Sequence, residues 1–216
     1  MIDNVKNKYL LKKIFEKIGN KRKLNIIKYN KRIKVKLKIN KNDFEIYATL
    51  KEFNDKYNSN IEDIDNKDIN LSLRNIGNEG LKNLVKIKFK RFKELNLSYN
   101  NISEINVFEK VDFKQLNKLD LRYNEISDIN ILEKINFKEL KKLNLGYNKI
   151  SDINILEKVD FKELNKLNLS HNVISDINIL EKFDFQELIK LDLSYNKISD
   201  KNILEKIFKF RRKSNL

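Results

Sequence analysis

The sequence predicts an α/β solenoid, in which repeated short strands form a parallel sheet and helices cap its N-terminal end. Shifting the chain against itself by 24 residues superposes five phenylalanines and nearly every apolar position between them. Within each unit, leucines alternate with polar residues and are followed by apolar residues at every third position. The superposed phenylalanines are Phe89, Phe113, Phe137, Phe161 and Phe185.

The first predicted element is a helix over residues 4–18, whose apolar side chains fall on one stripe and whose lysines lie mostly elsewhere. Gly19 and Asn20 end it. A second helix is expected around Leu24–Ile27. The stripe of the first helix consists of Leu10, Leu11, Ile14, Phe15 and Ile18.

Residues 33–39 alternate apolar and basic side chains, which favours a strand, although a continued helix is also compatible with them. A further helix is predicted after Asp43, where Phe44, Tyr47, Leu50 and Phe53 recur at helical spacing. We expect this N-terminal region, residues 1–64, to cover the open end of the first repeat, as a solenoid requires.

The repeats are expected to span residues 65–208, followed by a basic tail at 209–216. In the repeat around Leu119 and Leu121, these leucines alternate with polar residues and predict a short strand with one apolar face. Apolar residues then recur every three positions, at Ile126, Ile129, Leu132 and Ile135, which predicts a tight helical or 3₁₀ return path.

Two further positions recur in every regular repeat. The asparagines at the strand-to-turn corner are predicted to satisfy backbone groups of the turn, and the phenylalanines are predicted to stack as a core spine. The asparagines are Asn100, Asn124, Asn148, Asn172 and Asn196.

The segment L-x-x-L-x-L-x-x-N, as at Leu116 to Asn124, resembles the signature of the leucine-rich repeat family. The resemblance covers residues 89–208 and implies a leucine-rich repeat solenoid, a horseshoe with a concave parallel sheet. The recurring I-S-D-I is similar to the repeats of bacterial internalins and of a phosphatase-regulating nuclear subunit. This chain departs from internalins in repeat length and in carrying Ile155 and Ile179 where they have proline.

Residues 69–84 resemble a ribonuclease-inhibitor type of repeat and are interpreted as one degenerate repeat ahead of five regular ones. Leu71 and Leu73 are expected in its strand, and Ile76, Gly77 and Gly80 in the following turn. The consensus asparagine is missing at the expected spacing.

Composition argues against an enzyme. The chain has no cysteine and one histidine, His171, which excludes thiol chemistry and any site that needs two imidazoles. No phosphate-binding glycine loop, paired catalytic carboxylates or nucleophile with its base can be found, so no catalytic, cofactor or metal residue is predicted. Neither a secretory signal nor a stretch of 18 apolar residues is present, which predicts a cytoplasmic location.

The net charge of +15 lies at the two ends of the chain. Residues 1–41 carry +13 and residues 206–216 carry +5, whereas the body between them carries −3. Nucleic acid or an anionic membrane is therefore an unfavoured partner of the repeats, and an AT-biased coding sequence is an alternative explanation for the lysines.

The segment Tyr9–Leu37 resembles a diverged F-box, the module that docks ubiquitin-ligase adaptors on a Skp-type subunit. An apolar pair at Leu10 and Leu11 precedes Ile14-Phe15, and Leu24 follows a short loop. The family's opening Leu-Pro and its later tryptophan are absent. The alternative is that the segment is only a cap.

Strand register is expected to align equivalent polar residues into columns across the concave face, where a protein partner would bind. The alternative is that duplication copied these residues and that they are only solvated. His171 replaces a tyrosine in its column, and no partner group suggests that it is a catalytic base or a ligand. The predicted partner-binding residues are Tyr99, Lys118, Asp120, Arg122, Tyr123, Lys142, Tyr147, Lys166, His171, Lys190, Asp192 and Tyr195.

Three hypotheses follow: a non-catalytic protein-binding scaffold, an F-box-like substrate adaptor, and a basic surface that binds nucleic acid or membrane. The scaffold is favoured because the repeat body is nearly neutral and offers a tyrosine column beside a lysine column.

Overall fold

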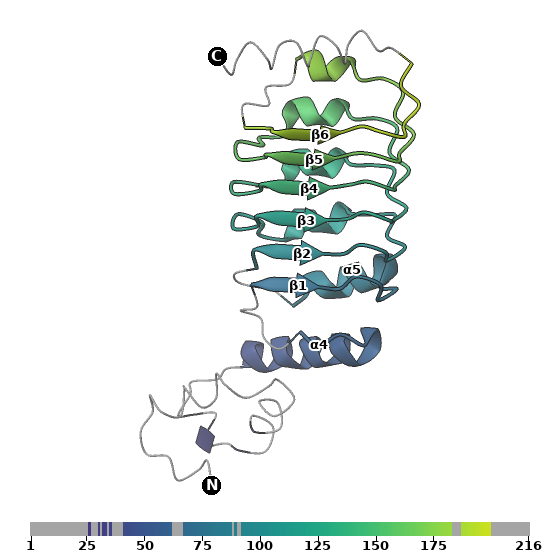
Figure 1. Ribbon diagram of the computed structural model, residues 1–216. Coiled ribbons are helices and arrows are strands. Elements are labelled where there is room, and N and C mark those ends of the chain that lie inside the picture. The colour runs from purple at the N-terminus through teal and green to yellow at the C-terminus, as the bar shows by residue number, and fades with distance from the viewer. Residues whose placement is uncertain are drawn as a thin grey trace.

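Six strands form one parallel sheet in sequence order, and the return segments run behind it (Figure 1). The computed structural model describes residues 26, 30, 32–33, 35, 41–61, 67–87, 89, 92–182 and 187–199. The predicted solenoid, with one irregular and five regular strands, is confirmed, and its sheet is open. The strands are β1 (Asp68–Asn70), β2 (Glu94–Asn96), β3 (Lys118–Asp120), β4 (Lys142–Asn144), β5 (Lys166–Asn168) and β6 (Lys190–Asp192).

Each regular repeat alternates as the sequence predicts. Leu119 and Leu121 are fully buried behind the sheet, while Lys118 lies on the other face. The return path is a 3₁₀ helix, since the Leu132 N–H donates to the Ile129 carbonyl at 3.0 Å and the Ile135 N–H to the Leu132 carbonyl at 3.2 Å. These helices are η2 (Asn106–Lys110), η3 (Asn130–Lys134), η4 (Asn154–Lys158) and η5 (Asn178–Glu181).

The phenylalanine spine lies in the core between the sheet and the return path. The ring centroids of Phe113 and Phe137 are 5.7 Å apart, and those of Phe137 and Phe161 are 5.8 Å apart. Phe108 adds an edge-on contact to Phe113 at 5.1 Å. Such spacing is typical of aromatic pairs in cores, so the predicted structural role of this column is confirmed where it is described; Phe185 lies outside the described residues.

The N-terminal cap includes helix α4 (Lys41–Tyr57), close to where the sequence predicts it. Leu50, Phe53 and Tyr57 are buried in the same core as the repeats. Helix α5 (Gly77–Val85) follows β1, and its Gly80 lies against Tyr57: a Cβ on Gly80 would sit 3.0 Å from Tyr57 Cζ and 2.5 Å from Ile76 Cβ. The lack of a side chain at Gly80 therefore lets the cap approach the first repeat.

The degenerate first repeat differs from the prediction in register. Its strand is Asp68–Asn70, and Ile69 and Leu71 take the places of Leu95 and Leu97. Leu73, predicted in the strand, is 74% exposed in the left-handed conformation with φ +57°. Gly77 and Gly80, predicted in a turn, instead belong to helix α5. The predicted strand of this repeat was therefore wrong by two residues, since its buried pair is Ile69 and Leu71 instead of Leu71 and Leu73.

The predicted elements of residues 4–27 except Ile26, the basic tail at 209–216 and most of the F-box-like segment lie outside the described residues. In the segment 33–39, for which strand and helix were both open, the described residues Ile33 and Val35 are helical.

Candidate functional site

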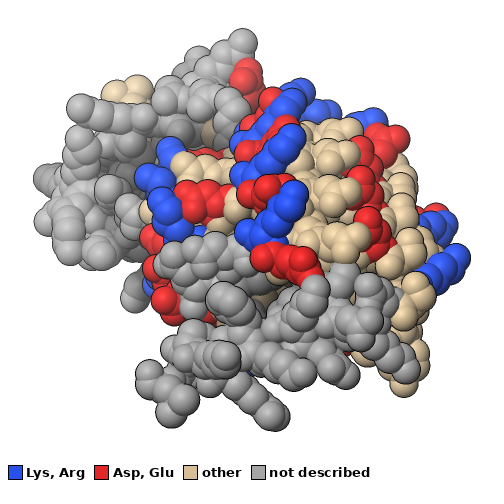
Figure 2. All heavy atoms as spheres, turned by 90° about the horizontal axis from the view of Figure 1, so that it is seen from above, with Lys and Arg blue, Asp and Glu red and all other residues tan. Residues whose placement is uncertain are grey.

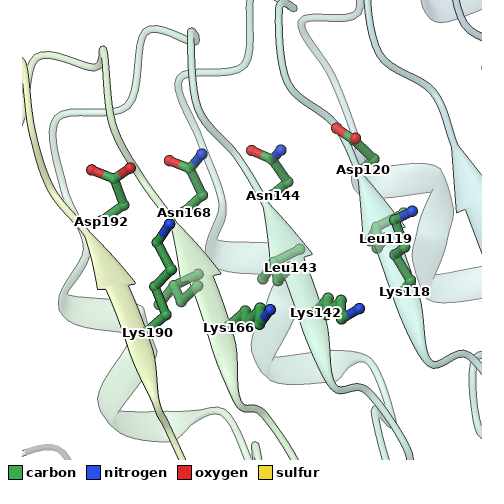
Figure 3. A pocket seen from close by; sticks show the side chains of 11 residues that line it. Lys118, Leu119, Asp120, Lys142, Leu143, Asn144, Lys166, Asn168, Lys190 and Asp192 are labelled. Atoms are coloured by element: carbon green, nitrogen blue, oxygen red, sulfur yellow. The ribbon is translucent and has the colours of Figure 1, made fainter.

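Side chains on the exposed face of the sheet form two rows that run across the strands (Figure 3). Their alignment is fixed by register, because Lys118, Lys142, Lys166 and Lys190 are direct partners on successive strands. We call these four residues the lysine row. The second row, called the Asx row, contains Asn96, Asp120, Asn144, Asn168 and Asp192.

The two rows border a shallow hollow of about 200 Å³ that runs from β3 to β6. Lys118 Nζ lies 3.4 Å from a carboxylate oxygen of Glu94, so its charge is compensated. Lys142 and Lys166 are exposed, and in the described part of the chain no carboxylate lies within ion-pair distance of them. The positive charge of the row is therefore least compensated on β4 and β5.

The Asx row forms part of the turn that follows each strand. Each side chain accepts a hydrogen bond from the backbone N–H two residues later, as Asn144 does from Gly146 at 3.1 Å. Asp120 is only 6% exposed, and its carboxylate lies 3.4 Å from Arg122 Nε. Of this predicted pair, Arg122 is thus the residue that presents surface.

At the C-terminal end of the row, hydrogen bonds from Ser194 lower the pKa of Asp192 below its ordinary value, with smaller contributions from the charges of Lys190 and His171. The Ser194 hydroxyl donates to Asp192 Oδ1 at 2.7 Å and the Ser194 N–H does so at 3.1 Å. Asp192 is therefore ionised at neutral pH and remains partly exposed.

Behind this face, the asparagines form a ladder that holds the turns and is buried except at Asn196, which is half-buried. Asn148 Nδ2 donates to the carbonyls of Leu121 and Leu145 at 3.0 Å and of Gly146 at 3.2 Å, and its Oδ1 accepts the Ile126 N–H at 3.0 Å. Each asparagine therefore bonds to its own repeat and to the preceding one, which confirms the predicted structural role. The asparagine ladder comprises Asn100, Asn124, Asn148, Asn172 and Asn196.

The residue before each ladder asparagine is aromatic, and all five adopt the left-handed conformation, with φ between +52° and +58°. Adjacent rings are nearly parallel, with interplanar angles of 11–14° and centroids 3.8–4.1 Å apart. Tyr99 and Tyr147 are each 39% exposed and Tyr195 is 74% exposed. We call this set the aromatic ladder; it contains Tyr99, Tyr123, Tyr147, His171 and Tyr195.

The stacking changes the acidity of the ladder. The pKa of Tyr147 is raised above 10.0, chiefly by a hydrogen bond with the Tyr123 side chain and then by desolvation. The pKa of Tyr99 is raised too, by desolvation first and by Tyr123 second. The rings border an open hollow of about 610 Å³, which extends to Leu73 on the first repeat.

The structure thus brings the predicted residues together in two adjoining strips: the lysine and Asx rows, and the aromatic ladder at the ends of the strands. Lysines and arginines share a stripe with acidic residues, and a second stripe is acidic (Figure 2). No group of three or more His, Asp or Glu side chains in the described ranges could hold a metal ion. Likewise, no described helix is long and apolar enough to cross a bilayer.

Sequence reasoning missed two features of this surface. The left-handed backbone under the rings has no signal, because tyrosine is not a residue that favours this conformation. The column that contains Arg122, two residues after the Asx row, is also largely hidden, since Ser98, Gly146 and Ser170 are buried. A signal for the latter was available: serine two residues after Asn or Asp is typical of a local side-chain turn.

Comparison with known protein families identifies two segments of the repeat region. Residues 114–158 match a family profile described as leucine-rich repeats in two copies, and residues 187–201 match a second leucine-rich repeat profile. No curated protein matches the chain.

Two solved structures with similar folds are an internalin (inlF) and internalin C2 (inlC2), both from Listeria monocytogenes str. 4b F2365. They are 28% and 26% identical to this chain, each with a TM-score of 0.48 over 59% of it. The matches span 34% and 52% of those two chains, which is less than two thirds of their length. The two matched profiles identify the segments 114–158 and 187–201 as leucine-rich repeats, and these segments contribute β3, β4 and β6 to the sheet.

Proposed function

We propose that the chain is a non-catalytic scaffold that binds a partner protein through the exposed sheet face and the aromatic ladder. The observation that carries the proposal is the aromatic ladder itself. Five consecutive repeats hold a ring in a left-handed conformation that glycine or asparagine would adopt with less strain. The conformation costs about 1–2 kcal/mol per residue, which favours a use for the rings beyond folding.

The chemistry of the ladder suits a protein partner. The interior rings are covered on both faces by neighbouring rings, whereas Tyr99, Tyr147 and Tyr195 remain exposed to solvent. Tyrosine is enriched in interface cores because it combines apolar area with a polar group at little cost in side-chain entropy. The adjoining lysines would form the rim of such an interface.

The experiment is affinity capture from cells with three baits: the full chain, a variant with Tyr147→Asn and Tyr195→Asn, and a control variant. Asparagine accepts the left-handed conformation, so the first variant removes rings without straining the turn. The control carries Glu157→Gln and Lys182→Gln, which are exposed on the helical side. We expect a protein that the control retains and the ring variant loses, and its purified form should show the same order of Kd values.

Capture of the same proteins by all three baits would contradict a role for the ladder. The F-box-like hypothesis gives a different result: a Skp-type subunit retained by the ring variant but lost when Leu11 and Phe15 are both changed to alanine. The hypothesis of a basic nucleic-acid or membrane binder predicts capture that disappears as salt is raised and is independent of the rings.

A further inference from the structure

The lysine row places like charges directly opposite each other. Lys142 is in register with Lys166, and Lys166 with Lys190, on strands that lie about 4.8 Å apart in a parallel sheet. Like charges in this position destabilise a sheet. A bound anion that crosses the strands would relieve this repulsion. Because the repulsion persists in the free protein, its relief on binding would contribute to affinity.

Compensation of the row is uneven, which locates the anion site. On β3 the charge of Lys118 is balanced by Glu94, and on β6 Lys190 lies near the ionised Asp192. On β4 and β5 the neighbours in the Asx row are the neutral Asn144 and Asn168 (Figure 3). The centre of the hollow is therefore its most positive part.

The two asparagines also present donors there. Asn144 Oδ1 accepts the Gly146 N–H at 3.1 Å, and Asn168 Oδ1 accepts the Ser170 N–H at 2.8 Å. Because each oxygen is used in its turn, the amide NH₂ groups remain to donate to a ligand. The ammonium groups of the two lysines and the NH₂ groups of the two asparagines are all donors, which is the chemistry that binds carboxylates.

We propose that an extended acidic segment of the partner protein crosses the sheet here, with carboxylates on Lys142 and Lys166. The inference rests on the proposed function and specifies its ligand. An extended chain places alternate side chains about 6.6–6.8 Å apart, within reach of two flexible lysines on neighbouring strands. The hollow of about 200 Å³ accommodates individual side chains, which suits a segment that lies over it.

Single-stranded nucleic acid fits this surface less well. Such ligands stack their bases on aromatic faces, but in the ladder each interior ring already has neighbours at 3.8–4.1 Å on both faces. The exposed edges of the rings can instead contact a peptide that runs beside the lysine row.

The test measures fluorescence anisotropy of a labelled ten-residue peptide of alternating Glu and Ser, with a Gln and Ser peptide for comparison. The full chain is compared with two charge-matched variants. One carries Lys142→Gln and Lys166→Gln; the other carries Lys149→Gln and Lys158→Gln, whose side chains lie 2.8 Å and 3.9 Å from Glu125 and Glu133. Because both lose two positive charges, binding to the basic ends of the chain contributes equally to each.

We expect the first pair of substitutions to weaken binding of the Glu peptide about tenfold more than the second, as for two lost charge contacts. Lys142→Arg with Lys166→Arg should restore most of the affinity. The urea midpoint of the variant with Lys142→Gln and Lys166→Gln should be no lower than that of the full chain, because these substitutions remove like-charge repulsion. Equal weakening by both pairs of substitutions overturns the inference. The inference also fails if Lys142→Gln with Lys166→Gln weakens the binding of a single-stranded deoxythymidine decamer more than that of the Glu peptide. Neither result changes the dependence of partner capture on the rings, so the proposed function is tested separately.

Discussion

The asparagine ladder and the aromatic ladder are neighbours in sequence and opposites in environment. Asn148 is buried and makes four hydrogen bonds to backbone groups, whereas Tyr147, one residue earlier, is partly exposed and contacts other rings. The asparagine position is unchanged in all five regular repeats, while the aromatic position tolerates His171.

The difference shows that duplication alone does not define a function. Both ladders are copied with the repeat, yet only the first joins backbone groups that would otherwise be buried without partners. The aromatic ladder adopts the left-handed conformation, which is unfavourable for tyrosine. A strained copy suggests use by a ligand, and an unstrained, bonded copy suggests folding.

The largest effect is expected at the asparagine ladder. Asn148→Ala leaves the Ile126 N–H without its partner and removes one of two donors from each of three carbonyls. It should lower the unfolding free energy by about 1–3 kcal/mol. Urea denaturation followed by circular dichroism measures this. Asn144→Ala, which removes only the bond from the Gly146 N–H on the exposed face, is the control and should cost about 1 kcal/mol or less. Equal midpoints for the two variants would contradict the assigned role.

A smaller effect is expected at Tyr147, where the glycine variant should be more stable than the alanine variant. Tyr147→Ala loses contacts with the rings of Tyr123 and His171 and keeps the left-handed strain. Tyr147→Gly removes the strain as well, so it should be more stable than the alanine variant by about 1 kcal/mol. In β4, where the backbone is extended, Lys142→Gly should instead be less stable than Lys142→Ala. If alanine is the more stable at both positions, the strain argument for ligand use fails.

The smallest effect concerns alkaline pH. The raised pKa of Tyr147 means that the folded ladder favours the neutral phenol, so this stabilisation is complete below pH 10 and is lost as the pH rises through the higher folded value. Tyr123→Phe removes the hydrogen bond and should lower the pKa of Tyr147 towards 10.0. Absorbance of tyrosinate during a pH titration detects the change. Tyr195→Phe, a minor cause of the shift, should alter it less.

The regular repeats could be predicted from sequence because three signals agree in each of them: alternating leucines, the corner asparagine and an apolar period of three. The first repeat lacked that agreement. Ile69, Leu71 and Leu73 alternate without a break, so a period of two fits either register. The register is set by Asn100 of the next repeat, which donates to the Leu71 carbonyl at 2.7 Å and accepts from the Ile76 N–H at 3.2 Å.

The candidate site was predictable as a set of columns, since strand register determines which residues align. Which members of a column present surface was not predictable, because it depends on local bonds. Asp120 and Asp192 hold the same position, yet Asp120 is buried beside Arg122 and Asp192 is not. Asp120 lies on β3, which has a neighbouring strand on each side, whereas Asp192 lies on β6 at the end of the sheet. Their bonding partners also differ, Arg122 in one case and Ser194 in the other.

The asparagine ladder gives the array a direction and makes its units interchangeable. Each asparagine completes the turn before it in the same way, so an added unit would meet on both sides the groups that its siblings already meet. Unequal recombination between copies would then yield chains one rung longer or shorter that still fold. Every such event would also change the length of the proposed binding strip by one lysine and one ring, so the reach of the molecule along a partner could evolve in fixed steps without a new core.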